Sequence, residues 1–124
     1  ISGGHEADLL RISIEEGEAK ARETVANGNM TAAEGAFYEK NARGLGELGI
    51  GLNPSATISG NMLEDEKAFH TCHFAIGSNY DNDADSPIHL DCLVKNPTIE
   101  VKYPNGTSVV IEKDGILAPE YGDV

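Results

Sequence analysis

The stretch HTCHFAIGSNYDNDADSPIHLDCLV, residues 70–94, contains two apolar runs separated by a polar loop. Each run is short, and turn-forming residues bound it, which is typical of a β-strand. We therefore predict strands over residues 70–76 and 88–94, joined by a long polar loop. Two consecutive strands with such a connection are expected to pair in antiparallel fashion.

Three side chains with metal-ligand chemistry lie on these two strands. Side chains alternate between the faces of a strand, so His89 and Asp91 share one face. His73 lies on the preceding strand, and pairing of neighbouring strands can place it beside His89. Imidazole and carboxylate groups are suitable ligands for zinc, manganese, cobalt or iron. A lone His-x-Asp pair is more often structural, but together with His73 it predicts a divalent metal site.

Two glutamates outside these strands are further candidates. Glu66 closes the acidic run 64–66 close to the strand of His73, where it can supply a ligand or a general base. For the other two acidic residues of that run we favour a solvated charge cluster. Glu47 begins the glycine-rich apolar segment 47–52, where a carboxylate marks either an exposed strand start or a chemical role. Glycine in such a strand allows another group to approach the backbone closely.

The N-terminal part of the chain has helical patterns. A broken apolar face over residues 5–26 predicts a first helix, which Asn27-Gly28-Asn29 ends. Thr31-Ala32-Ala33-Glu34 has the form of a capping box, because the threonine and glutamate side chains can each bond the other's backbone amide. It predicts a second helix that ends at about residue 42. The short connection indicates an antiparallel helix pair.

The C-terminal part of the chain has strand patterns. Apolar and polar residues alternate over 98–103 and 108–112, and Pro104-Asn105-Gly106 between them predicts a hairpin. Helices first and antiparallel strands later favour an α+β fold. We expect an N-terminal helix pair followed by a mostly antiparallel, curved or barrel-like sheet. A chain of 124 residues suits a single domain, 1–124.

Composition limits the partners. The formal net charge is −12, from 9 basic and 21 acidic residues. Such a surface repels phosphate, so we expect neither nucleic acid nor an anionic membrane as partner. Cys72 and Cys92 lie in apolar runs, which indicates buried free thiols in a reducing compartment. Because no signal peptide or membrane-spanning run is recognised, we predict a cytoplasmic protein.

Four segments in this order are similar to the aminopeptidase T family, the thermophilic leucyl metalloaminopeptidases. They are ELGIGLNP (47–54), GNMLEDEKA (60–68), CHFAIG (72–77) and HLD (89–91). The resemblance covers about the last two thirds of the chain. It implies a metallopeptidase that uses two divalent ions, zinc, cobalt or manganese, to remove leucine-like N-terminal residues from peptides. It also implies a homodimer in the full-length protein.

The resemblance assigns a role to each matching residue. The residues that it implies to bind metal are Glu47, His73, His89 and Asp91. Glu66 matches the general base, and Tyr80 matches a tyrosine that stabilises the tetrahedral intermediate. Taken by itself, a tyrosine in a polar loop is more often a surface aromatic.

The family is longer than this chain. Its members have an N-terminal α/β domain and a further metal-binding glutamate, and both would lie before Ile1. We therefore expect this chain to be the C-terminal metal-binding part of a longer metallopeptidase. By itself it should bind metal weakly, because a site with fewer fixed carboxylates has a lower affinity.

Two alternatives stay open. The same superfamily contains an iron-dependent dioxygenase that cleaves a dihydroxypyridine ring. It holds iron with two histidines and one aspartate, a role that His73, His89 and Asp91 could fill. The third possibility is a catalytically incomplete fragment that serves folding or dimerisation.

Overall fold

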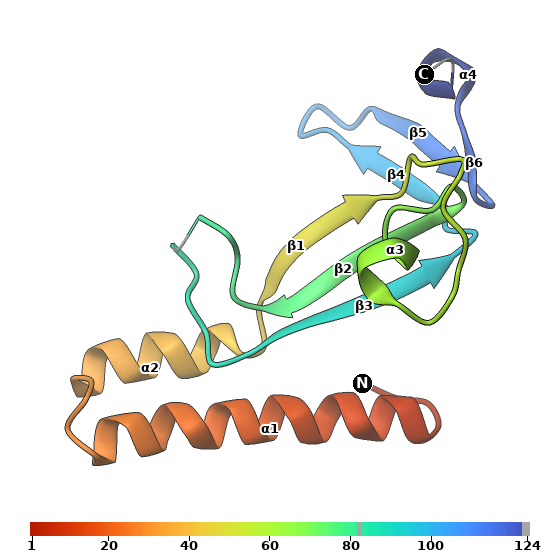
Figure 1. The fold of residues 1–124 in the computed structure, drawn as a ribbon. Helices are drawn as coiled ribbons and strands as arrows, with labels where there is room; N and C mark the ends of the chain where they lie inside the picture. The colour runs from red at the N-terminus through yellow and green to blue at the C-terminus, as the bar shows by residue number, and fades with distance from the viewer. Residues whose placement is uncertain (82, 123–124) are drawn as a thin grey trace. The chain divides into compact units, whose positions relative to one another are not determined.

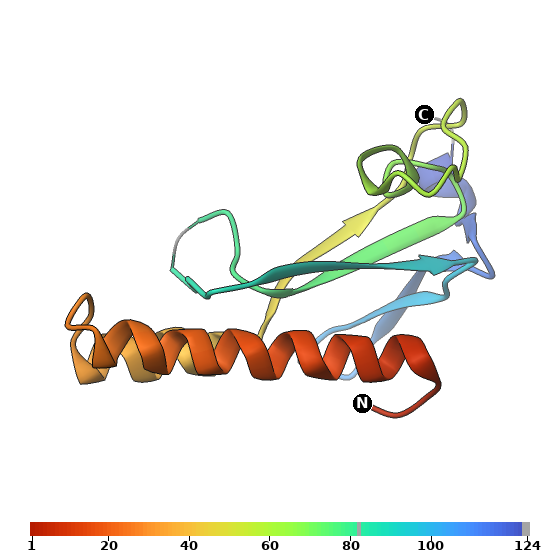
Figure 2. The same ribbon diagram turned by 60° about the horizontal axis from the view of Figure 1, so that its bottom comes forward.

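The computed structural model of the chain describes residues 1–81 and 83–122 (Figure 1 and Figure 2). The helices are α1 (His5–Ala26), α2 (Ala32–Asn41), α3 (Met62–Asp65) and α4 (Pro119–Gly122). The strands are β1 (Leu45–Ile50), β2 (Thr71–Gly77), β3 (His89–Lys95), β4 (Ile99–Lys102), β5 (Ser108–Lys113) and β6 (Ile116–Leu117). The helix pair α1 and α2 comes first, and two three-stranded sheets follow, in the orders β1-β2-β3 and β4-β5-β6. The predicted α+β class is confirmed, and the described strands form open sheets, not a closed barrel.

The chain forms two compact units, which are described separately below. One unit contains Ile1–Glu47 and Phe74–Asp91, and the other contains Leu48–His73 and the chain from Cys92 onward. Strands β1, β2 and β3 each begin in one unit and end in the other.

The first unit contains the helix pair. Helices α1 and α2 pack side by side (Figure 1). Ile14 and Ala21 of α1 are buried. Just after helix α1, Gly28 adopts a left-handed conformation, and its N–H donates to the carbonyl of Val25. The predicted capping box is present at the start of α2, where Thr31 and Glu34 bond each other's backbone amides. Local sequence signals therefore predicted this part of the fold correctly.

Strands β1 and β2 are antiparallel. At one end the N–H of Gly77 donates to the carbonyl of Gly44, and at the other end the N–H of Gly51 donates to Thr71. Strand β1 covers residues 45–50, so both its start and its end lie two residues earlier than in the predicted segment 47–52. The difference arises because backbone pairing, not side-chain hydrophobicity, sets where a strand starts.

Strands β2 and β3 are also antiparallel. Ser78 donates to the carbonyl of Ile88, and Asn96 donates to that of His70. Both strands lie one residue later than predicted. Strand β2 is mostly buried, so its polar His73 needs polar neighbours.

The second unit contains the predicted hairpin. Strands β4 and β5 are antiparallel, with Val101 opposite Val109. In the connecting turn, the N–H of Gly106 donates to the carbonyl of Tyr103. Strand β6 then pairs with β5. The sequence patterns missed β6, α3 and α4, because elements of two to four residues are too short to show periodicity.

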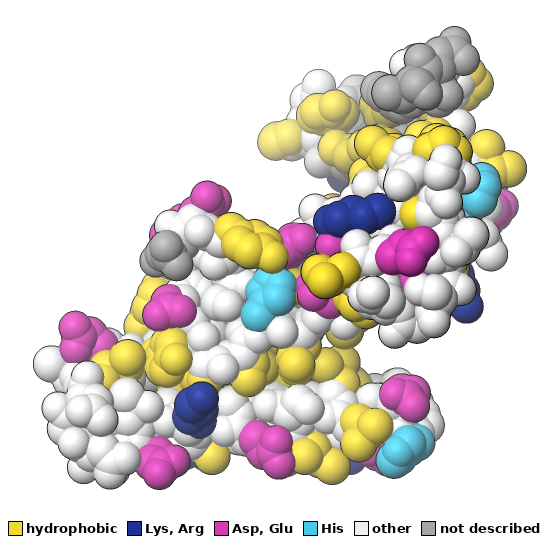
Figure 3. Space-filling model, viewed as in Figure 1, with side chains coloured by type: hydrophobic (Ala, Val, Ile, Leu, Met, Phe, Trp, Pro, Cys, Tyr) yellow, Lys and Arg dark blue, Asp and Glu magenta, His cyan; other side chains and the backbone are white. Residues whose placement is uncertain are grey.

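The surface is acidic. Asp and Glu side chains are spread over the face shown in Figure 3 and do not gather in one patch. Of the two predicted buried thiols, Cys72 is buried and Cys92 is half-buried. No described helix is long and apolar enough to cross a bilayer.

Candidate metal centre

His89, the first residue of β3, has its imidazole held by the backbone. Its Nδ1 atom lies 2.7 Å from the carbonyl oxygen of Ser78, in the loop that follows β2. A carbonyl only accepts, so Nδ1 carries the proton and donates it. In the neutral ring the lone pair is then on Nε2. A hydrogen bond of this kind is how proteins orient histidines that bind metals.

Two carboxylates face this lone pair. The Nε2 atom of His89 lies 3.2 Å from Oδ1 of Asp91 and 3.5 Å from Oε2 of Glu47. The three side chains are about one quarter exposed. The Nε2 atom is itself buried and has no hydrogen-bond partner in the described part of the chain. Neither carboxylate oxygen is therefore placed to accept a hydrogen bond from Nε2. Three facing lone pairs are mutually repulsive, and a cation between them removes the repulsion.

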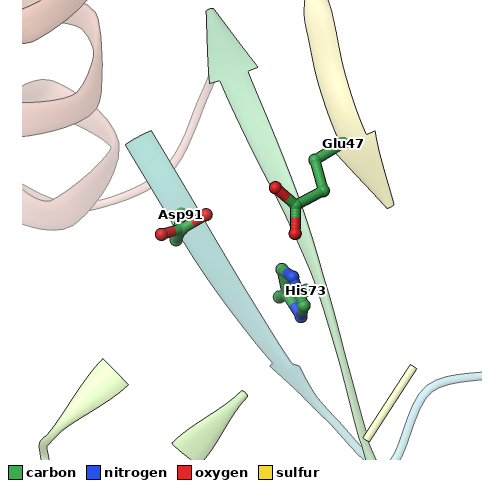
Figure 4. A group of neighbouring side chains, drawn as sticks. All are labelled: Glu47, His73 and Asp91. Atoms are coloured by element: carbon green, nitrogen blue, oxygen red, sulfur yellow. The ribbon is translucent and has the colours of Figure 1, made fainter. Parts of the chain in front are cut away.

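Glu47 and Asp91 also belong to a second arrangement. Glu47, His73 and Asp91 each offer one ligand atom, and these atoms all lie within 4.8 Å of one another. They come from β1, β2 and β3 respectively (Figure 4). Two ligands of one divalent ion lie at most about 4.6 Å apart, since each metal–ligand bond is about 2.0–2.3 Å long, so this limit is close to the geometry of a shared ion. The donor set of imidazole and carboxylate therefore fits the expected metal.

Glu66 lies beside His73. Its Oε2 atom is 3.8 Å from Nε2 of His73, and Nζ of Lys67 is 2.5 Å from its other oxygen. The Glu66 side chain is 11% exposed, whereas that of His73 is 5% exposed. A shielded carboxylate next to a ligand candidate can act as a base or as a further ligand. The structure therefore places the Glu66 carboxylate beside one of the candidate ligands, His73.

Tyr80 lies in the loop between β2 and β3. Its ring centroid is 5.6 Å from that of His89, and the two rings are tilted by 56°. The residue is 79% exposed. The structure therefore brings Tyr80 to one ligand candidate while leaving its ring accessible to a substrate. The two histidines that we did not assign lie elsewhere: His5 begins α1, and Nδ1 of His70 contacts the carbonyl of Gly115.

Sequence reasoning missed the contribution of Ser78. Its backbone carbonyl orients His89, and a carbonyl is common to every residue type. The glycines of β1 were a partial signal, because they predicted a close approach without saying which group approaches.

No protein-family model, no curated protein and no solved structure matches the chain.

Proposed function

We propose that this chain carries the metal centre of a metalloaminopeptidase that removes leucine-like N-terminal residues from peptides. The observation that carries the proposal is the position of His89 Nε2, which faces Asp91 at 3.2 Å and Glu47 at 3.5 Å while Nδ1 is held by a carbonyl. Nitrogen and carboxylate ligands of this kind suit zinc, cobalt or manganese. The motif resemblance supplies the choice of reaction.

Different residues of the chain have different roles in amide hydrolysis. Divalent ions at this centre would lower the pKa of a water and polarise the scissile carbonyl. Glu66 accepts a proton from the attacking water and passes it to the leaving amine. The hydroxyl of Tyr80 donates a hydrogen bond to the oxyanion of the tetrahedral intermediate. The exposed position of Tyr80 beside His89 allows this role.

The setting of the reaction is also part of the proposal. The substrate is a peptide, and the net charge of −12 disfavours nucleic acid and anionic membranes as partners. Cysteine thiols such as that of the buried Cys72 suit the reducing cytoplasm. We propose that the full-length protein is a homodimer, as the resemblance implies.

An iron-dependent ring-cleaving dioxygenase is the second candidate. Two histidines and one aspartate on neighbouring strands match the ligands that such enzymes use. The carboxylate of Glu47, close to His89 Nε2, is an additional acidic group that this chemistry does not need. It therefore favours the hydrolase.

Metal content and activity of three variants test the proposal. We expect the full-length wild-type protein to bind zinc, cobalt or manganese and to hydrolyse a leucine anilide. The Glu66→Gln protein should keep the metal and lose activity by roughly 10²–10⁴-fold, because the amide cannot accept a proton. The His89→Ala protein should lose metal and activity together. His5→Ala, which removes an exposed histidine at the start of α1, is the control and should change neither.

Three results would reject the aminopeptidase. Full peptidase activity of Glu66→Gln would remove its role as base. Aerobic ring cleavage that requires Fe(II), without anilide hydrolysis, would establish the dioxygenase instead. A full-length wild-type protein without affinity for any of these metals would reject both enzymes.

A further inference from the structure

We infer that β1 positions both histidines of the metal centre because two of its residues are glycines, which leave room for neighbouring groups. Gly46 and Gly49 lie on either side of Glu47 in this strand. Gly46 leaves space for the carbonyl that orients His89, and Gly49 leaves space for the imidazole of His73. The inference rests on the proposed metal centre and adds two positioning residues to it.

Gly46 makes room for the backbone of the loop after β2. A Cβ atom at this position would lie 2.5 Å from the carbonyl oxygen of Ser78 and 2.6 Å from that of Gly77. Real Cβ atoms essentially never come within 3.0 Å of such a neighbour, so the loop would have to move. The carbonyl of Ser78 is the group that accepts the Nδ1 proton of His89. A side chain at position 46 therefore removes the hydrogen bond that fixes this imidazole.

Gly49 makes room for the other imidazole. A Cβ atom there would lie 2.7 Å from Nδ1 and 2.6 Å from Nε2 of His73, and closer still to Cε1 between them. His73 is only 4% exposed, so its ring has little free space into which it can move. An alanine at position 49 must displace the imidazole from the place where it meets the carboxylates.

Gly51, directly after β1, provides a matched comparison. A Cβ atom there would lie 2.6 Å from Oγ1 of Thr71 and closer still to the carbonyl of Ala68. None of its three nearest atoms belongs to a histidine. Alanine at position 51 therefore disturbs packing at least as much as the other two changes, without reaching an imidazole directly.

Cobalt titration of Gly46→Ala, Gly49→Ala and Gly51→Ala tests the inference, with the folded fraction measured by circular dichroism. We expect Gly46→Ala and Gly49→Ala to bind Co(II) about 10–100-fold more weakly per folded molecule, the usual cost of losing a group that orients a ligand. Gly51→Ala should lower stability and leave the affinity of the folded protein unchanged.

Imidazole nitrogen NMR without metal is the second readout. The wild-type ring of His89 should be almost entirely the Nδ1–H tautomer, because Ser78 accepts that proton. In Gly46→Ala both tautomers should appear. In Gly49→Ala the signals of His73 should shift while the tautomer of His89 is kept. A purely structural role of the glycines would not separate the two histidines in this way.

Specific outcomes of the metal-binding, tautomer and folding measurements would overturn the inference. It fails if Gly51→Ala weakens metal binding as much as the other two, or if Gly46→Ala keeps both the tautomer and the affinity. If Gly49→Ala does not fold, Gly49→Ala combined with His73→Ala should fold, because the clashing ring is gone; a double variant that also fails to fold contradicts the role of Gly49. A wild type that binds no cobalt would count against the proposed function, while the tautomer of His89 still tests Gly46.

Discussion

At the scale of single residues, Glu112 has a carboxyl group that is buried in the fold. It is 1% exposed, and its Oε2 atom has no hydrogen-bond partner in the described part of the chain. Burial raises the pKa of this carboxyl above its ordinary value, and His70 nearby partly opposes the shift. The folded protein therefore holds this proton more tightly than the unfolded chain does.

The sign of the pH dependence follows from that difference. Below the ordinary glutamate pKa, both states are protonated and Glu112 costs no stability through ionisation. As the pH rises from there through the raised pKa of the folded state, the unfolded chain gains more from ionisation, and the free energy of unfolding falls. We predict that Glu112→Gln lacks this fall and is more stable than wild type at neutral pH.

Urea unfolding at a series of pH values checks the prediction. The two proteins should be similar in acid and should diverge as the pH rises. Glu100→Gln, an exposed glutamate on β4, is the control and should follow wild type. Parallel curves for wild type and Glu112→Gln would contradict it.

At the scale of one element, the start of α2 depends on a single side chain. Oγ1 of Thr31 accepts from the N–H of Glu34 at 3.2 Å, and the Glu34 carboxylate accepts from the N–H of Thr31 at 2.8 Å. The Thr31 hydroxyl also donates to the Glu34 carboxylate, at 2.7 Å, and this bond together with the one from the Thr31 N–H lowers the pKa of the Glu34 carboxyl. Helix α2 has only ten residues, so its first turn is a large part of it.

Removing the cap should destabilise the protein measurably. We predict that Thr31→Ala lowers the free energy of unfolding by about 1 kcal/mol, the usual cost of losing an N-cap. Thr24→Ala is the control, because Thr24 bonds the carbonyl of Lys20 inside α1 and caps nothing. It should be neutral or slightly stabilising, since alanine has the higher helix propensity. Equal losses in urea unfolding would refute the capping role.

At the scale of the whole molecule, a bound cation should stabilise the fold. The candidate ligands come from β1, β2 and β3, so an ion that binds only the folded chain favours folding. At a free metal concentration 100 times the dissociation constant, the gain is about 2.7 kcal/mol. We predict that zinc or cobalt raises the melting temperature and that a chelator reverses the rise.

Because the chain has a net charge of −12, any cation also screens repulsion, and this effect needs its own control. Asp91→Asn and Asp8→Asn each remove one negative charge. Only Asp91→Asn changes a candidate ligand, whereas Asp8 is an exposed residue of α1. The metal-dependent rise should be lost in the first and retained in the second. A rise of equal size in both would show general screening only.

The amino-acid sequence by itself determined the α+β order, the ends of α1 and α2, and the strands that carry the candidate ligands. These features depend on periodicity and on capping residues such as Thr31 and Gly28, which act over a few neighbouring positions. The shared face of His89 and Asp91 follows from the same local rule. Both could therefore be predicted without any tertiary contact.

Only the tertiary structure decided how the ligands are oriented. The carbonyl of Ser78 on His89 and the fit of His73 against Gly49 join segments that are distant in sequence. The strand ends and the open form of the sheets depend on backbone pairing in the same way. Backbone groups are alike in every residue, and a glycine does not specify the group that comes close to it. Such contacts exist only once the chain has folded.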